Sequence, residues 1–225
     1  KKGKKVCDIP DRRQERINKM IHKMETEKAE ASIAIGYGVV DATAATTGQI
    51  SSIAFPDNKE DIYLSWIGAG LGIGVVGGLT ILFNHEQILL DIFEGWHYYR
   101  QYLEKNPLLK GNQINTWNGR WISQRYDREY DSDDPLMNFN PLVPMSDGLF
   151  NLQTVPWAEV IAGIARNNRT SNMVGYLYSI GQTNTTVGFI PFKLQDIIRP
   201  SQLYAKIFGE SVWMQNRKKV EALYG

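Results

Sequence analysis

The chain has 225 residues, of which 43% are hydrophobic and 22% are charged, and these proportions are those of a globular protein rather than a disordered one. The formal net charge of +1 argues against a protein that coats nucleic acid through its overall charge. A single cysteine, Cys7, excludes a disulfide within the chain and a zinc site built from several cysteines.

Residues 1–30 are rich in charge, with ten Lys and Arg against six Asp and Glu. Asp11 follows Pro10 and can cap a helix, in which apolar residues recur at helical spacing at Ile17, Met20, Ile21 and Met24. This pattern predicts a charged amphipathic helix that packs on its own domain or lies along a membrane or a partner. No short apolar core with a small-residue cleavage site follows the first lysines, so we expect no secretory signal peptide.

Residues 31–55 carry one charge, Asp41, and many small side chains. Residues 56–61, with the sequence PDNKED, have the composition of a turn. An apolar segment followed by an acidic turn favours the first half of a helical hairpin.

Residues 62–84 carry no charge, and this stretch is long enough to cross a bilayer as a helix. Its glycines include small-xxx-small spacings, which allow two helix backbones to approach closely. The residues predicted to make this helix packing are Gly68, Gly70, Gly72, Gly74 and Gly78. Together with residues 31–55, this stretch predicts a glycine-rich helical hairpin. Close backbone packing would hold its two helices together, and the hairpin could be embedded in a membrane.

Two other interpretations of residues 62–84 stay open. The stretch can instead be a buried apolar helix, or a strand and turn, within a large soluble assembly. It also contains a GxGxxG match at Gly72, Gly74 and Gly77, which is typical of a dinucleotide-binding turn when a strand precedes it and a helix follows.

Residues 85–104 predict an amphipathic helix with an aromatic cluster close to the uncharged stretch. Such a cluster is typical of an interfacial belt at a membrane, of a stacking platform for nucleic-acid bases, or of half-buried packing. The candidate interface residues are Trp96, Tyr98, Tyr99, Arg100 and Tyr102.

The remainder of the chain predicts a loop-rich α+β portion. Residues 110–153 are rich in turn residues, and their alternating acids lack the glycine and the closing glutamate of a calcium loop. Residues 155–166 predict a short helix, and residues 174–180 and 186–192 predict a β-hairpin. Pro200 is expected to open a helix that Gly209 ends, and Ser211 to cap a last, basic helix.

Motifs of nucleotide-binding loops, zinc proteases, serine hydrolases and redox cysteine pairs are not found in the sequence. We therefore predict no catalytic residues, no metal site and no cofactor, and an enzyme is the less favoured class.

The predicted fold is mainly α with a small β-hairpin, divided into residues 1–30, 31–84, 85–110 and 111–225. The predicted function is a non-enzymatic structural subunit of a larger assembly that binds other protein subunits and is anchored in a membrane through the glycine-rich hairpin. The alternative is a soluble, cytoplasmic subunit of a nucleic-acid-binding machine, with the glycine-rich segment buried at a subunit interface. In that alternative Arg120, Arg125, Arg166 and Arg169 are the candidate contacts with nucleic acid.

Overall fold

The computed structural model describes residues 10–26, 58–68, 70–168, 172–179 and 185–221. In chain order the elements are α1 (Pro10–Thr26), α2 (Lys59–Gly68), β1 (Ile73–Val75), β2 (Leu79–Phe83), α3 (Glu86–Lys105), α4 (Ile114–Arg125), β3 (Leu142–Pro144), β4 (Phe150–Leu152), α5 (Trp157–Asn167), β5 (Asn172–Ser179), β6 (Thr185–Lys193), α6 (Leu194–Phe208) and α7 (Glu210–Glu221). Strands β1, β2, β5 and β6 form an antiparallel sheet in that order, and β3 and β4 form a second, two-stranded sheet.

The described part of the chain is therefore an α+β protein, and the predicted mainly α fold with a glycine-rich helical hairpin is wrong. Helix α2 ends at Gly68, and residues 73–83 form the β1–β2 hairpin. Gly77 and Gly78 join the two strands with φ angles of +97° and +74°, which side-chain-bearing residues rarely adopt. The β-branched residues on either side favour strands, whereas glycines would each cost a helix about 1 kcal/mol.

The membrane-spanning helix predicted over residues 62–84 is also wrong. Among the described helices, none combines the length and the hydrophobicity that a membrane crossing needs. The other half of the predicted hairpin, residues 31–57, lies outside the described residues.

The GxGxxG match does not have the context of a dinucleotide-binding turn. The motif requires a strand before its first glycine, but Gly72 precedes β1 and Gly74 lies within it, and the second strand of a hairpin follows Gly77 instead of a helix. No helix N-terminus lies at this turn to receive a pyrophosphate.

Several locally encoded elements are confirmed. Helices α1, α3 and α5 and the β5–β6 hairpin lie where periodicity and turn residues predict them. Helix α6 differs, because it begins at Leu194 and continues through Pro200. Helix α4 is not predicted by the sequence, since residues 110–153 read as loops.

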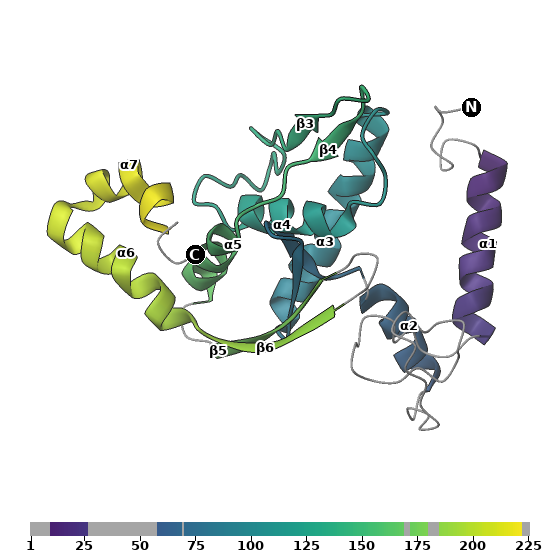
Figure 1. Cartoon of the computed structure of the whole chain (residues 1–225), viewed down its shortest axis with the longest axis horizontal. Helices are drawn as coiled ribbons and strands as arrows, with labels where there is room; N and C mark the ends of the chain where they lie inside the picture. Colours follow the sequence, from purple (N-terminus) through teal and green to yellow (C-terminus); the bar gives the residue numbers. More distant parts are fainter. Residues whose placement is uncertain (1–9, 27–57, 69, 169–171, 180–184, 222–225) are drawn as a thin grey trace.

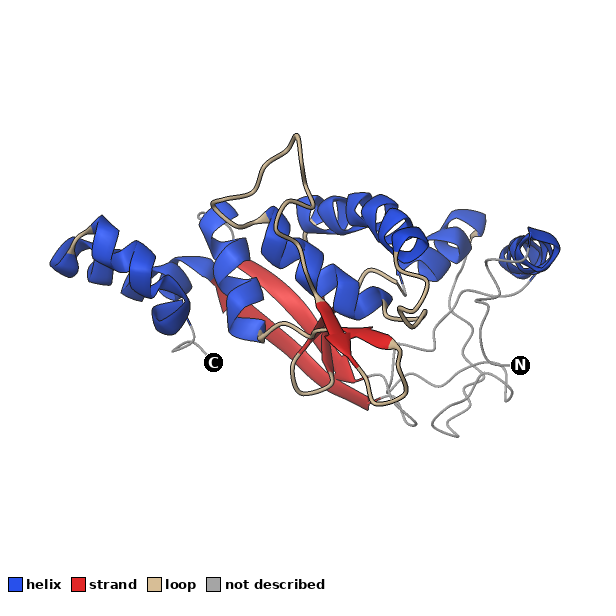
Figure 2. Cartoon of the chain, turned by 90° about the horizontal axis from the view of Figure 1, so that it is seen from above, coloured by secondary structure: helices blue, strands red, loops and turns tan. Residues whose placement is uncertain are grey.

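The centre of the main sheet joins distant parts of the chain, because β2 pairs with β5 in a register that sets Leu79 opposite Ser179 and Phe83 opposite Gly175. One face of this sheet carries the buried side chains of Ile81, Phe83 and Phe192. In Figure 1, β5 and β6 run below α3, α4 and α5, and Figure 2 shows the central helices along the sheet, with further helices beyond both of its ends.

Helix α4 is central to the core. Trp117 and Trp121 are fully buried and lie one helical turn apart, and Ile122, directly after Trp121, is fully buried as well. A single core cluster extends from Ile73 to Leu194 and includes residues of α3, α4, α5 and all four strands of the main sheet.

Candidate functional site

Three of the five predicted packing glycines lie in close contacts, but with α3, α4 and the sheet rather than with a second glycine-rich helix. A Cβ atom on Gly72 would lie 2.3 Å from the hydroxyl of Tyr178, and one on Gly74 would lie 2.9 Å from the backbone of Asn115. A Cβ atom on Gly70 would lie 2.9 Å from the ring of Trp96. Gly68 and Gly78 have nothing within 4 Å of such an atom.

The backbone of this glycine segment is held by two asparagines of α4 that sequence reasoning missed. The Asn118 amide donates hydrogen bonds to the carbonyl oxygens of Gly70 and Gly72, at 2.7 and 2.8 Å. Asn115 donates to Gly72 at 2.9 Å. Trp96 donates its indole N–H to the Asn118 oxygen at 3.0 Å and so fixes the orientation of that amide. These contacts satisfy carbonyl groups next to β1, and they bury its glycines within the chain itself.

The five aromatic and arginine candidates lie on α3 and are used largely within the chain. Tyr98 stacks on Trp121 at 4.8 Å, and Tyr99 packs against Trp117 at 5.0 Å. The ring of Tyr102 also packs against Trp117, at 5.4 Å. Arg100 pairs with Glu104 one turn later in the same helix. Their role at an interface with a partner stays a prediction.

A buried acid, Asp91, links α3 to α4. Its carboxylate accepts hydrogen bonds from the Tyr126 hydroxyl at 2.5 Å and from Gln87 at 3.0 Å. Burial and the contact with Asp91 raise the pKa of Tyr126 far above its ordinary value, so this phenol stays protonated and donates. The cluster opens into no described cavity, and we assign it to the stability of the α3–α4 contact.

Most of the arginines proposed for nucleic-acid contacts have internal partners. Arg120 donates from Nε to the carbonyl of Gln153 at 2.7 Å. Arg125 lies over the ring of Tyr130 at 4.7 Å, and Arg166 pairs with Glu221. Arg169 lies outside the described residues. The three described arginines thus form no open basic patch of the kind that a phosphate backbone needs.

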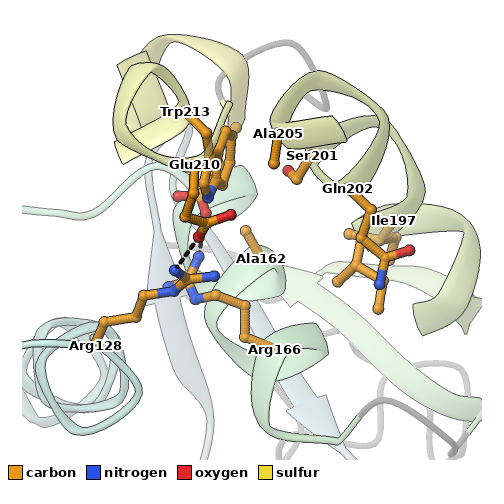
Figure 3. Close-up of a pocket in the computed structure, with 11 residues that line it drawn as sticks. Arg128, Ala162, Arg166, Ile197, Ser201, Gln202, Ala205, Glu210 and Trp213 are labelled. Carbon is orange, nitrogen blue, oxygen red and sulfur yellow. Dashed lines mark hydrogen bonds and ion pairs between the residues drawn. The ribbon is translucent and has the colours of Figure 1, made fainter. Parts of the chain in front are cut away.

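A further candidate site lies between α5 and the pair of helices α6 and α7, which we call the α6–α7 hairpin. It holds a cavity of about 280 Å³. Figure 3 shows Arg128 and Arg166 extending from opposite sides toward Glu210, with Trp213 above them. The full lining consists of Arg128, Ala162, Arg166, Ile197, Ile198, Ser201, Gln202, Ala205, Glu210, Trp213 and Glu221.

Three ion pairs join the α6–α7 hairpin to the rest of the chain. Arg217 reaches Asp127 at 2.6 Å, and Arg128 reaches Glu210 at 2.9 Å. Arg166 and Glu221 form the third pair, and it is the most buried, with side chains 13% and 6% exposed. The cavity lies beside these pairs, so its walls combine apolar surface with fixed charges of both signs.

Burial affects the acids of these pairs differently. Burial raises the pKa of Glu221, and Arg166 and Arg217 only partly offset this rise. Burial alone would also raise the pKa of Asp127, but the N–H of Glu129 and the Arg217 guanidinium outweigh it and hold that pKa below its ordinary value. Glu221 is therefore the acid whose charge depends most on its arginine partner.

An exposed apolar surface lies on the main sheet, opposite the face that carries Ile81 and Phe83. The register sets Val174 opposite Pro191, and Tyr176 opposite both Leu82 and Phe189, so these side chains share one face. We call the set Leu82, Val174, Tyr176, Phe189 and Pro191 the outer face. Phe189 is 71% exposed although its ring packs on Tyr176 at 5.1 Å.

No group of three or more His, Cys, Asp or Glu suited to a metal ion occurs within the part of the chain that the structure describes. Comparison with family models, with curated proteins and with solved structures gave no match.

Proposed function

We propose that this chain is a non-enzymatic subunit of a protein assembly and that it docks onto another protein through the outer face of its main sheet. The exposure of large apolar side chains on that face carries the proposal. A sheet normally buries at least one face, and the second face of an antiparallel sheet is usually polar where it meets water. Here Thr80 and Tyr178 of the second face are buried, whereas the outer face beside them is apolar and aromatic and reaches solvent at Val174 and Phe189.

The composition of the outer face fits a protein partner. Phe189 is 71% exposed and Val174 is 42% exposed, so neither side chain is used by the core. Contiguous apolar surface of this kind marks interaction sites, and aromatic residues are enriched at the centres of protein interfaces. None of the five residues of the outer face is charged, and exposed Lys193 lies on the same side of β6 at its end.

The edge of the sheet supports docking on the face rather than addition of a strand. The Val174 carbonyl accepts from the Asn84 N–H, so the polar backbone groups of Val174 face β2 and its pair with Pro191 exchanges no ladder hydrogen bonds. The Pro191 nitrogen, which carries no N–H, therefore lies on the side of β6 away from β5. A proline at this place interrupts the row of donors that an incoming strand would use.

Pro191→Val is therefore expected to increase self-association through β6. One added hydrogen bond contributes about 0.5–1.5 kcal/mol, which corresponds to roughly a 2- to 12-fold tighter association constant. Sedimentation of the full chain over a range of concentrations measures this change. Pro107→Val, which adds the same N–H in an exposed turn, serves as the control. Equal behaviour of the two variants would contradict the role assigned to Pro191.

A photo-crosslinking amino acid at position 189 tests the proposed docking. In cells that naturally make the protein, we expect substitution at Phe189 to give discrete protein adducts. The same substitution at Leu90, a residue of α3 that is 54% exposed, is expected to give none. Phe189→Lys should abolish co-purification of the partner found by crosslinking. Its thermal midpoint should stay within about 4 °C of the parent, because the substituted side chain is mostly exposed.

The results separate the alternatives. Adducts at position 189 that consist only of this chain would identify the partner as a second copy. Adducts that a nuclease removes, equal adducts at positions 189 and 90, or no adducts at position 189 would each contradict docking of a protein on the outer face.

A further inference from the structure

The cavity beside the α6–α7 hairpin has an apolar floor. Ala162 of α5, Ile197, Ile198 and Ala205 of α6, and Trp213 of α7 supply it. Trp213 is 3% exposed, so its ring is covered on most sides by protein. A volume of about 280 Å³ lies just below the range of small-molecule sites, which suits a ligand of one amino acid in size.

The rim of the cavity carries one charge of each sign. The Arg128 and Glu210 side chains are 40% and 63% exposed, and they are joined by one bond of 2.9 Å from Nη1 to Oε1. Arg128 uses the same Nη1 for the Met214 sulfur at 3.4 Å. Among the described residues, its Nη2 and the Glu210 Oε2 have no partner. The pair therefore keeps one donor and one acceptor that are not used within the described chain.

A neutral rim of this kind discriminates by charge. A ligand with only a carboxylate would gain Arg128 but would meet the like charge of Glu210, and a ligand with only an ammonium would meet Arg128. A zwitterion gains both contacts without breaking the existing pair, because its carboxylate can accept from Nη2 and its ammonium can donate to Oε2.

We propose that this cavity binds a free α-amino acid with an apolar side chain. Its carboxylate binds Arg128, its ammonium binds Glu210, and its side chain occupies the floor formed by Ala162, Ile197 and Trp213. Arg166 and Glu221 also line the cavity, but their charges already neutralise each other in a buried pair, so we assign the ligand's charges to the exposed Arg128–Glu210 pair, although the buried Nε of Arg166 has no hydrogen-bond partner among the described residues. This inference is independent of the docking proposed for the outer face.

Titration of the full chain with L-leucine and L-phenylalanine, followed by calorimetry, tests the proposal. Binding is expected for both, at least 10-fold tighter than for glycine, which lacks the side chain. N-acetyl-L-leucine has lost the positive charge and L-leucinamide the negative charge, so each is expected to bind at least 10-fold more weakly than leucine.

Substitutions locate the site. Arg128→Met and Glu210→Gln are each expected to lower leucine affinity at least 10-fold. The matched control is Asp147→Asn, which removes one partner of the exposed Lys110–Asp147 pair and should leave the affinity unchanged. Ala162→Leu should fill the cavity and abolish binding. If Ala162→Leu fails to fold, Arg128→Met and Glu210→Gln still show whether leucine binds at this cavity.

Three results would overturn the proposal. The first is no heat from leucine or phenylalanine at about 10 mM, where even a millimolar site is mostly occupied. The second is equal affinity for leucine and its singly charged analogues. The third is binding that survives both rim substitutions. The first result together with a raised thermal midpoint of Ala162→Leu would show that the cavity is only a gap in the packing.

Discussion

Replacing Gly119 by alanine is expected to lower the free energy of unfolding by about 3 kcal/mol, even though alanine favours a helix by about 1 kcal/mol more than glycine does. Gly119 lies in α4 where that helix crosses β1. A Cβ atom there would lie 2.4 Å from the carbonyl oxygen of Gly74 and 2.8 Å from the side chain of Val155. The first contact is with backbone, so α4 and β1 would have to move apart. Denaturant titration of the parent and the variant measures the change.

Gly68→Ala is the control for this prediction. Gly68 ends α2, and an added Cβ atom would have nothing within 4 Å. We expect its free energy of unfolding to stay within about 0.5 kcal/mol of the parent. Equal effects of the two substitutions would show that the close approach of α4 to β1 does not limit stability.

Arg166→Met is expected to lower the free energy of unfolding by about 3–4 kcal/mol at pH 8, because it leaves Glu221 buried without its partner. The loss should shrink as the pH falls toward 4.5, the ordinary pKa of a glutamate. Burial already raises the pKa of Glu221, and removal of Arg166 raises it further. A carboxyl whose folded pKa exceeds its unfolded pKa favours folding when protonated, and this stabilisation is lost as the pH rises through the folded pKa. Unfolding titrations between pH 4.5 and pH 8 measure the trend.

Two variants control this experiment. Arg166→Met combined with Glu221→Leu removes both charges, so we expect it to recover most of the lost stability and to lose the added pH dependence. Arg100→Met breaks an exposed pair within α3 and should cost at most about 0.5 kcal/mol. A deficit in Arg166→Met that is constant from pH 4.5 to pH 8 would mean that Glu221 is not the group responsible.

The sequence predicts those elements that local pattern determines. Apolar spacing in residues 85–104 predicts α3, and two β-prone runs around a turn predict the β5–β6 hairpin. Residues 62–84 are different, because a glycine-rich apolar run fits a packed helix as well as a hairpin of strands. The partner of β2 decides the outcome, and that partner is β5, which lies far along the chain. No local pattern in either segment specifies this pairing.

The candidate sites were less predictable than the elements. Asn115 and Asn118 belong to a stretch rich in polar and turn residues, and only the fold shows that their amides hold the backbone of Gly70 and Gly72. The cavity combines residues of α5, α6 and α7 with Arg128, so no spacing in the sequence reveals it. The exposure of Phe189 could have been suspected, because alternation along β6 places it opposite the buried Phe192 face.

The register between β2 and β5 has a kinetic consequence. Leu79 pairs with Ser179, one hundred residues later, so the two strands meet only after the helices between them have been brought together. Contacts between such distant residues slow folding, and domains dominated by them fold in milliseconds to seconds rather than microseconds. During synthesis on the ribosome, β2 therefore cannot complete its pairing until β5 has emerged. Until then, the edge of β2 that faces away from β1 has no partner strand.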